Sequence, residues 1–228
     1  MDTRKIVLLA AASMCLSTAA QGVTLVQTND AGFYNNSIGT TLNNTNGGDT
    51  STGYFPVTND STVNFPTPPD LSTASAALGN WLTDPLHLNS NWNHLSSIPN
   101  FWTPGTEVAV MYEFDTLGAT GVHASFGVDN GIFVWLDGNY LFGARAAGTH
   151  VPGEYQIPVG DLTAGTHFLQ LLLEDHGVTD GYDVLITAEE FTPGPGPGDG
   201  QAPEPATLAL LGIALAALAS QQRRKMRR

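Results

Sequence analysis

The residues of this chain that are best suited to chemistry are carboxylates set close to glycines. Asp175, Asp180 and Asp183 lie within the stretch EDHGVTDGYD, and Asp129 is followed directly by Asn130. Carboxylate and amide oxygens are the ligands that Ca²⁺ prefers in proteins. Their spacing does not follow the EF-hand loop, and solvated loop acids are the alternative. We keep calcium as a hypothesis for these residues and expect no other metal or cofactor.

A second set of residues has the chemistry of a carbohydrate site. Trp135 shares a strand face with Asp137, and Asp129 and Asn130 come just before the same strand. Tryptophan stacks on the apolar face of a sugar, while aspartate and asparagine bind its hydroxyl groups. These four residues therefore predict a glycan-binding site. The alternative is that Trp135 and the three tryptophans within residues 81–102 only fill the ends of the domain.

Familiar catalytic motifs do not occur in the sequence. There is no Gly-x-Ser-x-Gly and no His-Glu-x-x-His, and the six histidines show no ligand spacing within any one element. Glu174 and His176 would lie on one strand face with Asp175 opposite, where a carboxylate beside a histidine could transfer protons. Such residues more often close a strand and enter a loop. We expect that the chain is not an enzyme, and a secreted hydrolase remains a second alternative.

The elements that must position these residues are strands. Apolar residues alternate with a period of two over 108–114, 122–128 and 132–136, and many are β-branched or aromatic, which predicts three strands. The stretch FVWLDGNYLF places Asp137 and Gly138 between two apolar runs, a strong signal for a hairpin. Three later runs also predict strands: EYQIPV, THFLQLLLED and GYDVLITAEEF.

The strand pattern indicates an all-β fold. THFLQLLLED is apolar on both faces, so we expect a central strand that is covered on both sides. Short strands separated by turns, with one short helix expected within 71–82 and broken near Gly79, favour a jelly-roll-like β-sandwich. We place this single domain at residues 21–191, a length that supplies one adequate core.

The N-terminus differs from this body. Arg4 and Lys5 precede an apolar run at 6–16, and small residues follow at 17–20. This order is typical of a signal peptide, which we place at residues 1–20 and which implies the general secretion machinery as a partner. The single cysteine, Cys15, falls inside this segment. The mature chain therefore has no thiol for a disulfide, a zinc site or a nucleophile.

The charge distribution excludes one class of partner. Between the two end segments the chain holds 19 acidic residues and one basic residue, Arg145, which gives a net charge of about −18. Nucleic acid requires a basic surface that neutralises its phosphates. We therefore expect no nucleic-acid partner and a soluble domain whose charges repel one another.

The C-terminal segments point to the cell envelope. Residues 192–202, TPGPGPGDGQA, predict a linker, because alternating proline and glycine support neither a helix nor a strand ladder. An apolar run at 206–219 follows, and a helix over about 206–222 is only marginally long enough to cross a membrane. Five cations close the chain: Arg223, Arg224, Lys225, Arg227 and Arg228. They orient the C-terminus toward the cytoplasm and the body outward.

The tail also carries a specific motif. Pro203-Glu204-Pro205, an apolar run and an arginine-rich end together resemble the PEP-CTERM sorting signal, also called the C-terminal domain of ice-binding proteins. This family occurs on exported proteins of Gram-negative bacteria that make extracellular polysaccharide. The resemblance, which covers residues 203–228, implies that the membrane transpeptidase exosortase recognises Pro203, Glu204 and Pro205. It also implies that the transmembrane helix is a sorting handle that is removed rather than a permanent anchor.

A weaker resemblance concerns the body. Asp129-Asn130-Gly131, the Asp137-Gly138 turn and the stretch LTAGTH at 162–167 resemble features of galactose-binding-like jelly-roll sandwiches. The signal peptide and the PEP-CTERM resemblance together imply a protein that crosses the inner membrane, is held there by its tail before processing, and then resides at the cell surface or in the extracellular matrix. Binding of extracellular polysaccharide by the ectodomain is the hypothesis we favour. A cation-stabilised structural matrix protein without a ligand is the alternative.

Overall fold

The computed structural model describes residues 22–42, 63–146, 149–175 and 179–193. All structural statements below concern these residues. The predicted signal peptide, most of the predicted linker, the sorting signal and His176 lie outside them.

Ten strands and two short helical segments make up the described fold. In chain order these are β1 (Val23–Gln27), β2 (Gly32–Gly39), β3 (Val63–Asn64), the 3-10 helix η1 (Ser72–Ala74), α1 (Ser75–Leu78), β4 (Asn93–Leu95), β5 (Glu107–Leu136), β6 (Asn139–Ala146), β7 (Tyr155–Leu162), β8 (Gly165–Glu174), β9 (Gly181–Ala188) and β10 (Glu190–Pro193). All strand pairings are antiparallel. The expected all-β, sandwich-like class is confirmed.

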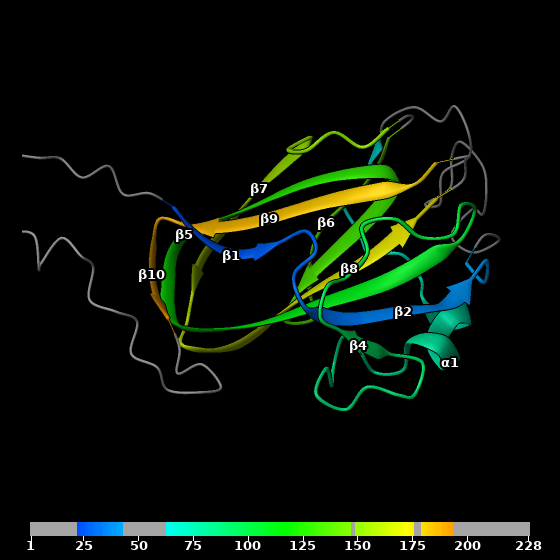
Figure 1. Ribbon diagram of the computed structural model, residues 1–228, viewed down its shortest axis with the longest axis horizontal. Helices are drawn as coiled ribbons and strands as arrows, with labels where there is room; N and C mark the ends of the chain where they lie inside the picture. The colour runs from blue at the N-terminus through cyan, green and yellow to red at the C-terminus, as the bar shows by residue number, and fades with distance from the viewer. Residues whose placement is uncertain (1–21, 43–62, 147–148, 176–178, 194–228) are drawn as a thin grey trace, which may run out of the picture. The chain divides into compact units, whose positions relative to one another are not determined.

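Strand β5 builds both layers of the sandwich. Its first part, 107–116, pairs with β2 and β8, and its last part, 131–136, pairs with β8 and β6, so β8 lies between two parts of one strand. Its middle part, 122–129, pairs with β7 and β9 in the other layer, which β1 extends. Figure 1 shows this single strand curling from one layer into the other.

The three alternating runs at 108–114, 122–128 and 132–136 are therefore parts of one strand rather than three separate strands. The reversal between the first two runs falls at residues 117–121, where Gly118 has a φ of 134° and Gly121 has a φ of 57°. These values lie in a region that glycine enters without steric cost. Strand β10 pairs with β5 across this bend, so the ladder continues where the sequence pattern suggested a break.

The predicted hairpin at Asp137-Gly138 is confirmed. Leu136 pairs with Asn139, and the two turn residues have φ values of 51° and 74°, as the tightest two-residue turns require. Gly138 is needed for a second reason, because a Cβ at this position would run into the carbonyl oxygen of Leu82. The hairpin is thus pressed against the segment that follows α1.

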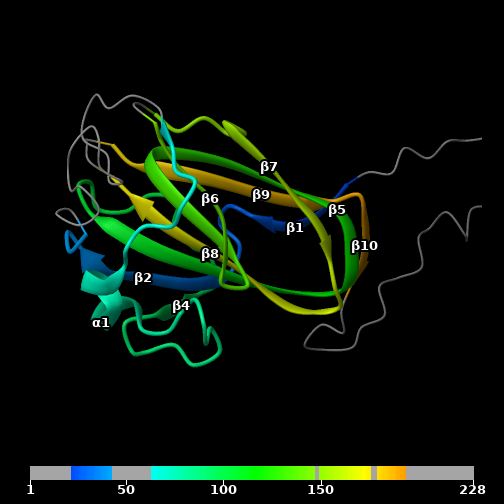
Figure 2. The same ribbon diagram turned by 180° about the vertical axis from the view of Figure 1, so that it is seen from behind.

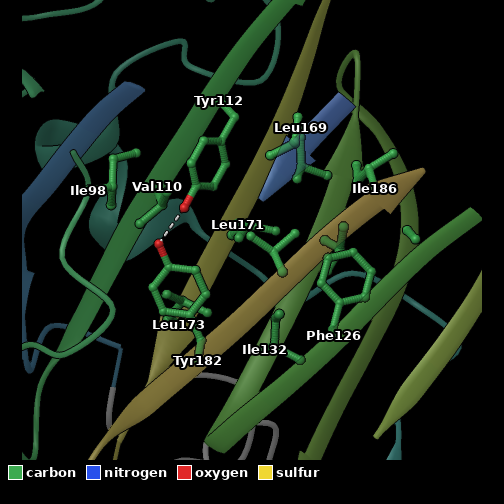
Figure 3. Packing of buried hydrophobic residues seen from close by; sticks show 14 of the residues in the cluster. Ile98, Val110, Tyr112, Phe126, Ile132, Leu169, Leu171, Leu173, Tyr182 and Ile186 are labelled. Atoms are coloured by element: carbon green, nitrogen blue, oxygen red, sulfur yellow. Dashed lines mark hydrogen bonds between the residues drawn. The ribbon is translucent and has the colours of Figure 1, made fainter. Parts of the chain in front are cut away.

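The main core fills the space between the two layers. Alternate residues of β5, β8 and β9 point into it, including Val110, Leu171 and Ile186. Two tyrosines meet inside this core, with their hydroxyl oxygens 2.6 Å apart (Figure 3). Burial raises the pKa values of Tyr112 and Tyr182 well above the usual range. Each hydroxyl thus stays protonated and satisfies the other in a place that water does not reach.

A second core covers the opposite face of the β5–β8 layer. Leu172 and Phe168 of β8 contribute to it, together with Trp81, Trp92 and Trp135. The short helix α1 and the loop after it form the cover (Figure 2). This confirms the expectation that β8 is central and buried on both faces. The helix expected within 71–82 is shorter, since η1 and α1 end at Leu78, before Gly79 with its φ of 64°.

The C-terminal limit of the folded domain lies slightly beyond the expected one. Strand β10 runs to Pro193, two residues into the stretch expected as a linker. Residues 195–228, which follow this strand, lie outside the described residues. Within the part of the chain that the structure describes, we find no helix with the length and apolar character needed to span a membrane.

Candidate functional site

Strand register brings three of the predicted carboxylates to one end of the domain. Asp129 on β5 lies opposite Gly181, the first residue of β9, so Asp180 is its near neighbour. Gly131, two residues further along β5, lies opposite Glu174, the last residue of β8, and Asp175 follows directly. Asp129 is thus about 50 positions from Asp175 and Asp180 in the sequence, but all three lie where β5, β8 and β9 adjoin.

These three carboxylates are buried and influence one another. Asp129, Asp175 and Asp180 are each less than one-tenth exposed. Burial, followed by the nearby charge of Asp175, raises the pKa of Asp129 to about 6. Burial also raises the pKa of Asp180, and the charge of Asp175 adds to that effect despite a hydrogen bond from the Trp102 backbone. The arrangement concentrates negative charge where solvent screens it poorly.

Hydrogen bonds account for only part of this cluster. Asp175 Oδ2 accepts from the Gly105 backbone at 2.6 Å, and Asp129 accepts from Asn130 Nδ2 at 2.8 Å and from Thr179 Oγ1 at 3.3 Å. By contrast, Asp180 Oδ2 is buried and has no hydrogen-bond partner among the described residues. A buried carboxylate oxygen without a donor costs free energy, so this atom calls for an explanation.

A histidine that the sequence did not single out lies beside the cluster. His150 packs against Gly181, and its Nε2 is 3.1 Å from Asp183 Oδ2. Its ring also meets that of Phe101 edge to face, with the centroids 6.0 Å apart. Asp183 therefore interacts with a histidine next to the other calcium candidates. The sequence signal was weak because His150 and Phe101 lie in loops with no periodic pattern.

A shallow groove adjoins this histidine. It has a volume of about 370 Å³ and runs along the outer face of β9. The lining residues are Ser125, Pro152, Gly153, Asp183, Val184 and Leu185. Phe101, whose ring contacts that of His150, is 55% exposed, which is unusual for a phenylalanine. The exposed ring and Asp183, which lines the groove, both lie next to His150.

The described side chains alone do not complete a metal centre. Within the described ranges, no group of three or more His, Cys, Asp or Glu side chains is placed so that it could hold a metal ion. Two carboxylates supplemented by backbone carbonyl oxygens and water would still be a ligand set of the kind Ca²⁺ accepts. The geometry thus brings the predicted acids together without closing them around one point.

The expectation for Trp135 needs correction. Its side chain is 3% exposed and lies between Trp81 and Tyr140, with ring centroids 5.6 and 5.5 Å away. Trp81 in turn contacts Trp92. A ring packed among other rings offers no face to a sugar. The tryptophans at 81, 92 and 135 are core residues, which was the alternative considered for them.

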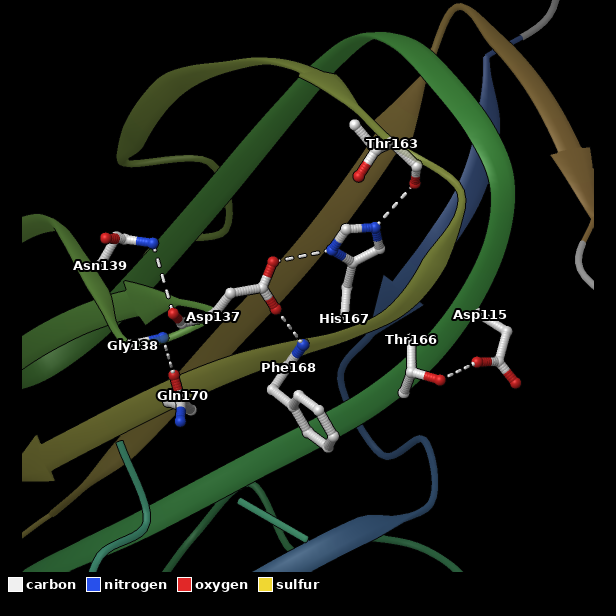
Figure 4. A network of polar contacts seen from close by, with 9 residues as sticks. All are labelled: Asp115, Asp137, Gly138, Asn139, Thr163, Thr166, His167, Phe168 and Gln170. Carbon is white, nitrogen blue, oxygen red and sulfur yellow. Dashed lines mark hydrogen bonds and ion pairs between the residues drawn. The ribbon is translucent and has the colours of Figure 1, made fainter. Parts of the chain in front are cut away.

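Asp137, a predicted ligand-binding residue, makes structural contacts within the fold. Its Oδ2 lies 2.7 Å from His167 Nδ1, and its Oδ1 accepts from the Phe168 backbone at 2.8 Å (Figure 4). The other ring nitrogen, His167 Nε2, is 2.9 Å from the Thr163 carbonyl oxygen. Both nitrogens face acceptors, an arrangement that favours the charged imidazole, and these hydrogen bonds raise the pKa of His167. Asp137 thereby ties the β5–β6 turn to the start of β8.

A row of buried charges runs across β5, β8 and β6. Glu107 pairs with Glu174, Glu174 pairs with Gly131, and Gly131 pairs with Arg145. Directly paired residues share a sheet face, so the three charged side chains lie in one row with a gap at the glycine. All three are buried. The single arginine between the two ends of the chain is therefore placed alongside two glutamates.

The candidate proton-transfer residues gain no additional support. Glu174 belongs to the buried row, Asp175 belongs to the acid cluster, and His176 lies outside the described residues. His123 is exposed on β5, whereas the ring of His167 is bonded to Asp137 and Thr163.

The C-terminal segment of the chain has the features of a sorting signal. Its Pro-Glu-Pro sequence, apolar run and arginine-rich end occur in that order at the C-terminus. Residues 201–225 match the PEP-CTERM protein-sorting motif. Among curated proteins, none matches the chain. The PEP-CTERM match confirms the predicted sorting signal and supports an exported protein at the cell surface or outside the cell, with exosortase as its sorting partner.

Proposed function

We propose that the chain is a surface or matrix component that exosortase processes at the membrane and whose folded domain then binds extracellular polysaccharide. The observation that carries the first part is the PEP-CTERM match at residues 201–225. The second part rests on the groove beside His150 and on the exposed ring of Phe101. Trp135, Asp129, Asn130 and Asp137 are not the contact residues in this proposal.

The groove has the chemistry that a neutral glycan needs. Ser125 and Asp183 line it, and both can hydrogen-bond sugar hydroxyl groups. Phe101 contacts His150, whose Nε2 lies 3.1 Å from Asp183 Oδ2, so an aromatic face and polar groups occur next to each other. The strongly acidic body repels acidic polymers unless cations bridge them. A neutral polysaccharide is therefore the expected class of ligand.

Glycan binding is tested with the purified protein on an array of neutral and acidic polysaccharides. Phe101→Ala is expected to reduce binding at least about tenfold, because it removes a strongly exposed aromatic ring next to His150. The matched control is Leu117→Ala, which removes a similarly exposed apolar side chain (53%) at the β5 bend. Equal binding by the two variants, or no binding by the parent protein, would refute this part of the proposal.

Sorting is tested by mass spectrometry of both termini of the protein from cells with and without the exosortase. We expect a mature N-terminus near residue 20 in both strains and a C-terminus truncated near Pro203–Pro205 only where exosortase is present. Replacing Glu204 by alanine should preserve the intact C-terminus in the exosortase-positive strain. An intact C-terminus in both strains contradicts the sorting proposal.

The second candidate function is a cation-stabilised structural protein without a glycan ligand. The buried acid cluster at Asp129, Asp175 and Asp180 favours it. An array without binding, combined with stabilisation by a divalent cation, would select this candidate. No geometric feature of the described residues favours a hydrolase.

A further inference from the structure

We infer that the polysaccharide-binding surface extends beyond the groove, across the outer face of the layer formed by β1, β9, the middle of β5 and β7. This inference rests on the proposed binding of a neutral glycan and adds the form of the ligand. The ligand is an internal stretch of a linear, uncharged polymer rather than a chain end or a single sugar. The four strands run side by side, and their pairings fix which side chains share this face (Figures 1 and 2).

Two rows of side chains cross the outer face from β7 to β1. Alternate residues such as Ala124 and Ile186 point into the main core, so the residues beside them point outward. Directly paired residues also share a sheet face. The first row is therefore Pro158, His123, Thr187 and Thr24, and the second row is Gln156, Ser125, Leu185 and Gln27. Each row crosses four strands, a width of about 14 Å at the usual strand spacing.

Both rows are accessible to a ligand and adjoin the groove. Six of the eight side chains are exposed, and Ser125 and Thr187 are half-buried. Ser125 and Leu185 also line the groove, so the second row continues the groove toward β1. Gln156 Nε2 donates to Ser125 Oγ at 2.9 Å, which holds two polar groups of this row in place. The groove and the rows thus form one surface.

The rows are uncharged in a strongly acidic domain. Neither contains an aspartate, glutamate, lysine or arginine, although the chain between its end segments has a net charge of about −18. Asp183, the next outward residue of β9, lies 3.1 Å from His150 Nε2. An uncharged polymer can cover the rows without desolvating a charged group, whereas a second copy of the chain would bring two strongly negative bodies together. The charge distribution therefore favours the polymer over self-association.

The chemistry and the shape of the face also suit a polymer. The hydroxyl and amide groups of serine, threonine and glutamine both donate and accept hydrogen bonds, as sugar hydroxyl groups do. Within the described residues, the edge strands β1 and β7 pair with no further strand on their outer sides. A polymer can therefore enter at one edge strand and leave at the other, so an internal stretch fits better than a chain end.

The test measures binding of the purified protein to ladders of neutral glucan, mannan, xylan and galactan, each from disaccharide to octasaccharide. We expect affinity to rise at least about tenfold along the ladder that binds, because a longer chain contacts both the groove and the rows. Thr24→Glu and Gln27→Glu place a charge at the β1 end of each row and should each lower octasaccharide affinity at least about tenfold. The matched control, Ser90→Glu, adds the same charge at an exposed position in the loop after α1 and should change nothing. Equal unfolding temperatures verify that all three variants fold.

The outcomes separate this inference from the proposed function. If Phe101→Ala weakens binding but chain length and the two β1 variants have no effect, the groove binds glycan and the extended face is refuted. If none of the neutral ladders binds, both the proposed function and this inference fail. Sedimentation of the parent protein tests the other occupant. A dimer that Gln27→Glu dissociates would assign the outer face to a second copy of the chain and overturn the inference.

Discussion

Asp137 shows how one carboxylate can fix a turn. It accepts from both His167 and the Phe168 backbone, and His167 also donates to the Thr163 carbonyl. Burial opposes the charged imidazole, but these hydrogen bonds outweigh that effect and raise the pKa of His167. The favourable interaction is therefore fully present below about pH 6.5 and is lost as pH rises through the raised pKa of the folded state.

We predict that His167→Gln lowers the free energy of unfolding by about 1–2 kcal/mol at pH 6 and by less at high pH. Urea unfolding at pH 6 and pH 9 measures both values. His87→Gln is the control, because His87 also bonds an aspartate, Asp84 at 2.7 Å, but is largely exposed. If the loss caused by His167→Gln is the same at both pH values, the charged histidine is not what holds the turn.

Asp129 should also make the free energy of unfolding depend on pH, but through an acid that the folded state keeps neutral. Its pKa is raised to about 6 in the folded protein, so the folded state favours the neutral acid. In chelator, the stability attributable to this group should fall as pH rises from about 4, the pKa of the unfolded chain, to about 6. Asp129→Asn should flatten the unfolding free energy across this interval. A parallel pH profile in parent and variant contradicts the assignment.

At the level of single residues, the sequence indicated which side chains could bind a ligand but not which of them are exposed to solvent. Asp129 and Asp180 were predicted as members of two separate calcium candidates. Their approach was not predicted, because it follows from the register of β5 against β9. The burial of Trp135 was one of two alternatives, and the sequence did not decide between them, because a tryptophan on a strand face looks the same whether a sheet or solvent covers it. His150 and Phe101 carried no signal, since their positions depend on loops that cross the end of β9.

Among the elements, β5 determines the arrangement of all the others. Its periodicity was visible in the sequence, and so was the Asp137-Gly138 turn that ends it. Its continuity was not visible, because the bend at 117–121 and the loop-like stretch at 129–131 resemble turns between strands. Pairing with β10 and β8 maintains the ladder there, and such long-range pairing leaves no local trace in the sequence.

Alanine substitutions at two glycines can distinguish the cost of a strained backbone from the cost of a steric clash. Gly39 and Gly138 both have positive φ, but a Cβ on Gly39 would meet open space, whereas one on Gly138 would meet the Leu82 carbonyl. We predict that Gly39→Ala costs about 1 kcal/mol of unfolding free energy and that Gly138→Ala costs clearly more. Chemical denaturation of both variants measures the difference. Equal losses would mean that the hairpin does not press on the segment after α1.

The whole molecule is dominated by its charge and its sorting tail. A net charge of about −18 between the end segments, with one arginine, favours expansion of the chain through repulsion. We predict that in chelator the unfolding temperature rises when NaCl is increased from about 10 to 150 mM, because screening weakens that repulsion. Differential scanning calorimetry measures it. A temperature that is independent of NaCl would show that the acids are already neutralised within the fold.

The pairing of Val23 with Ala188 has a consequence for display. Strand β10 begins two residues after Ala188, so the chain enters and leaves the described domain at the same end of β9. The acid cluster, opposite Gly181, is at the other end, about 25 Å away along eight residues of strand. A domain tethered by either terminus therefore holds these carboxylates distal to the point of attachment. A longer linker would increase the distance between the carboxylates and the point of attachment. The carboxylates would still lie at the end of the domain that is farther from the linker.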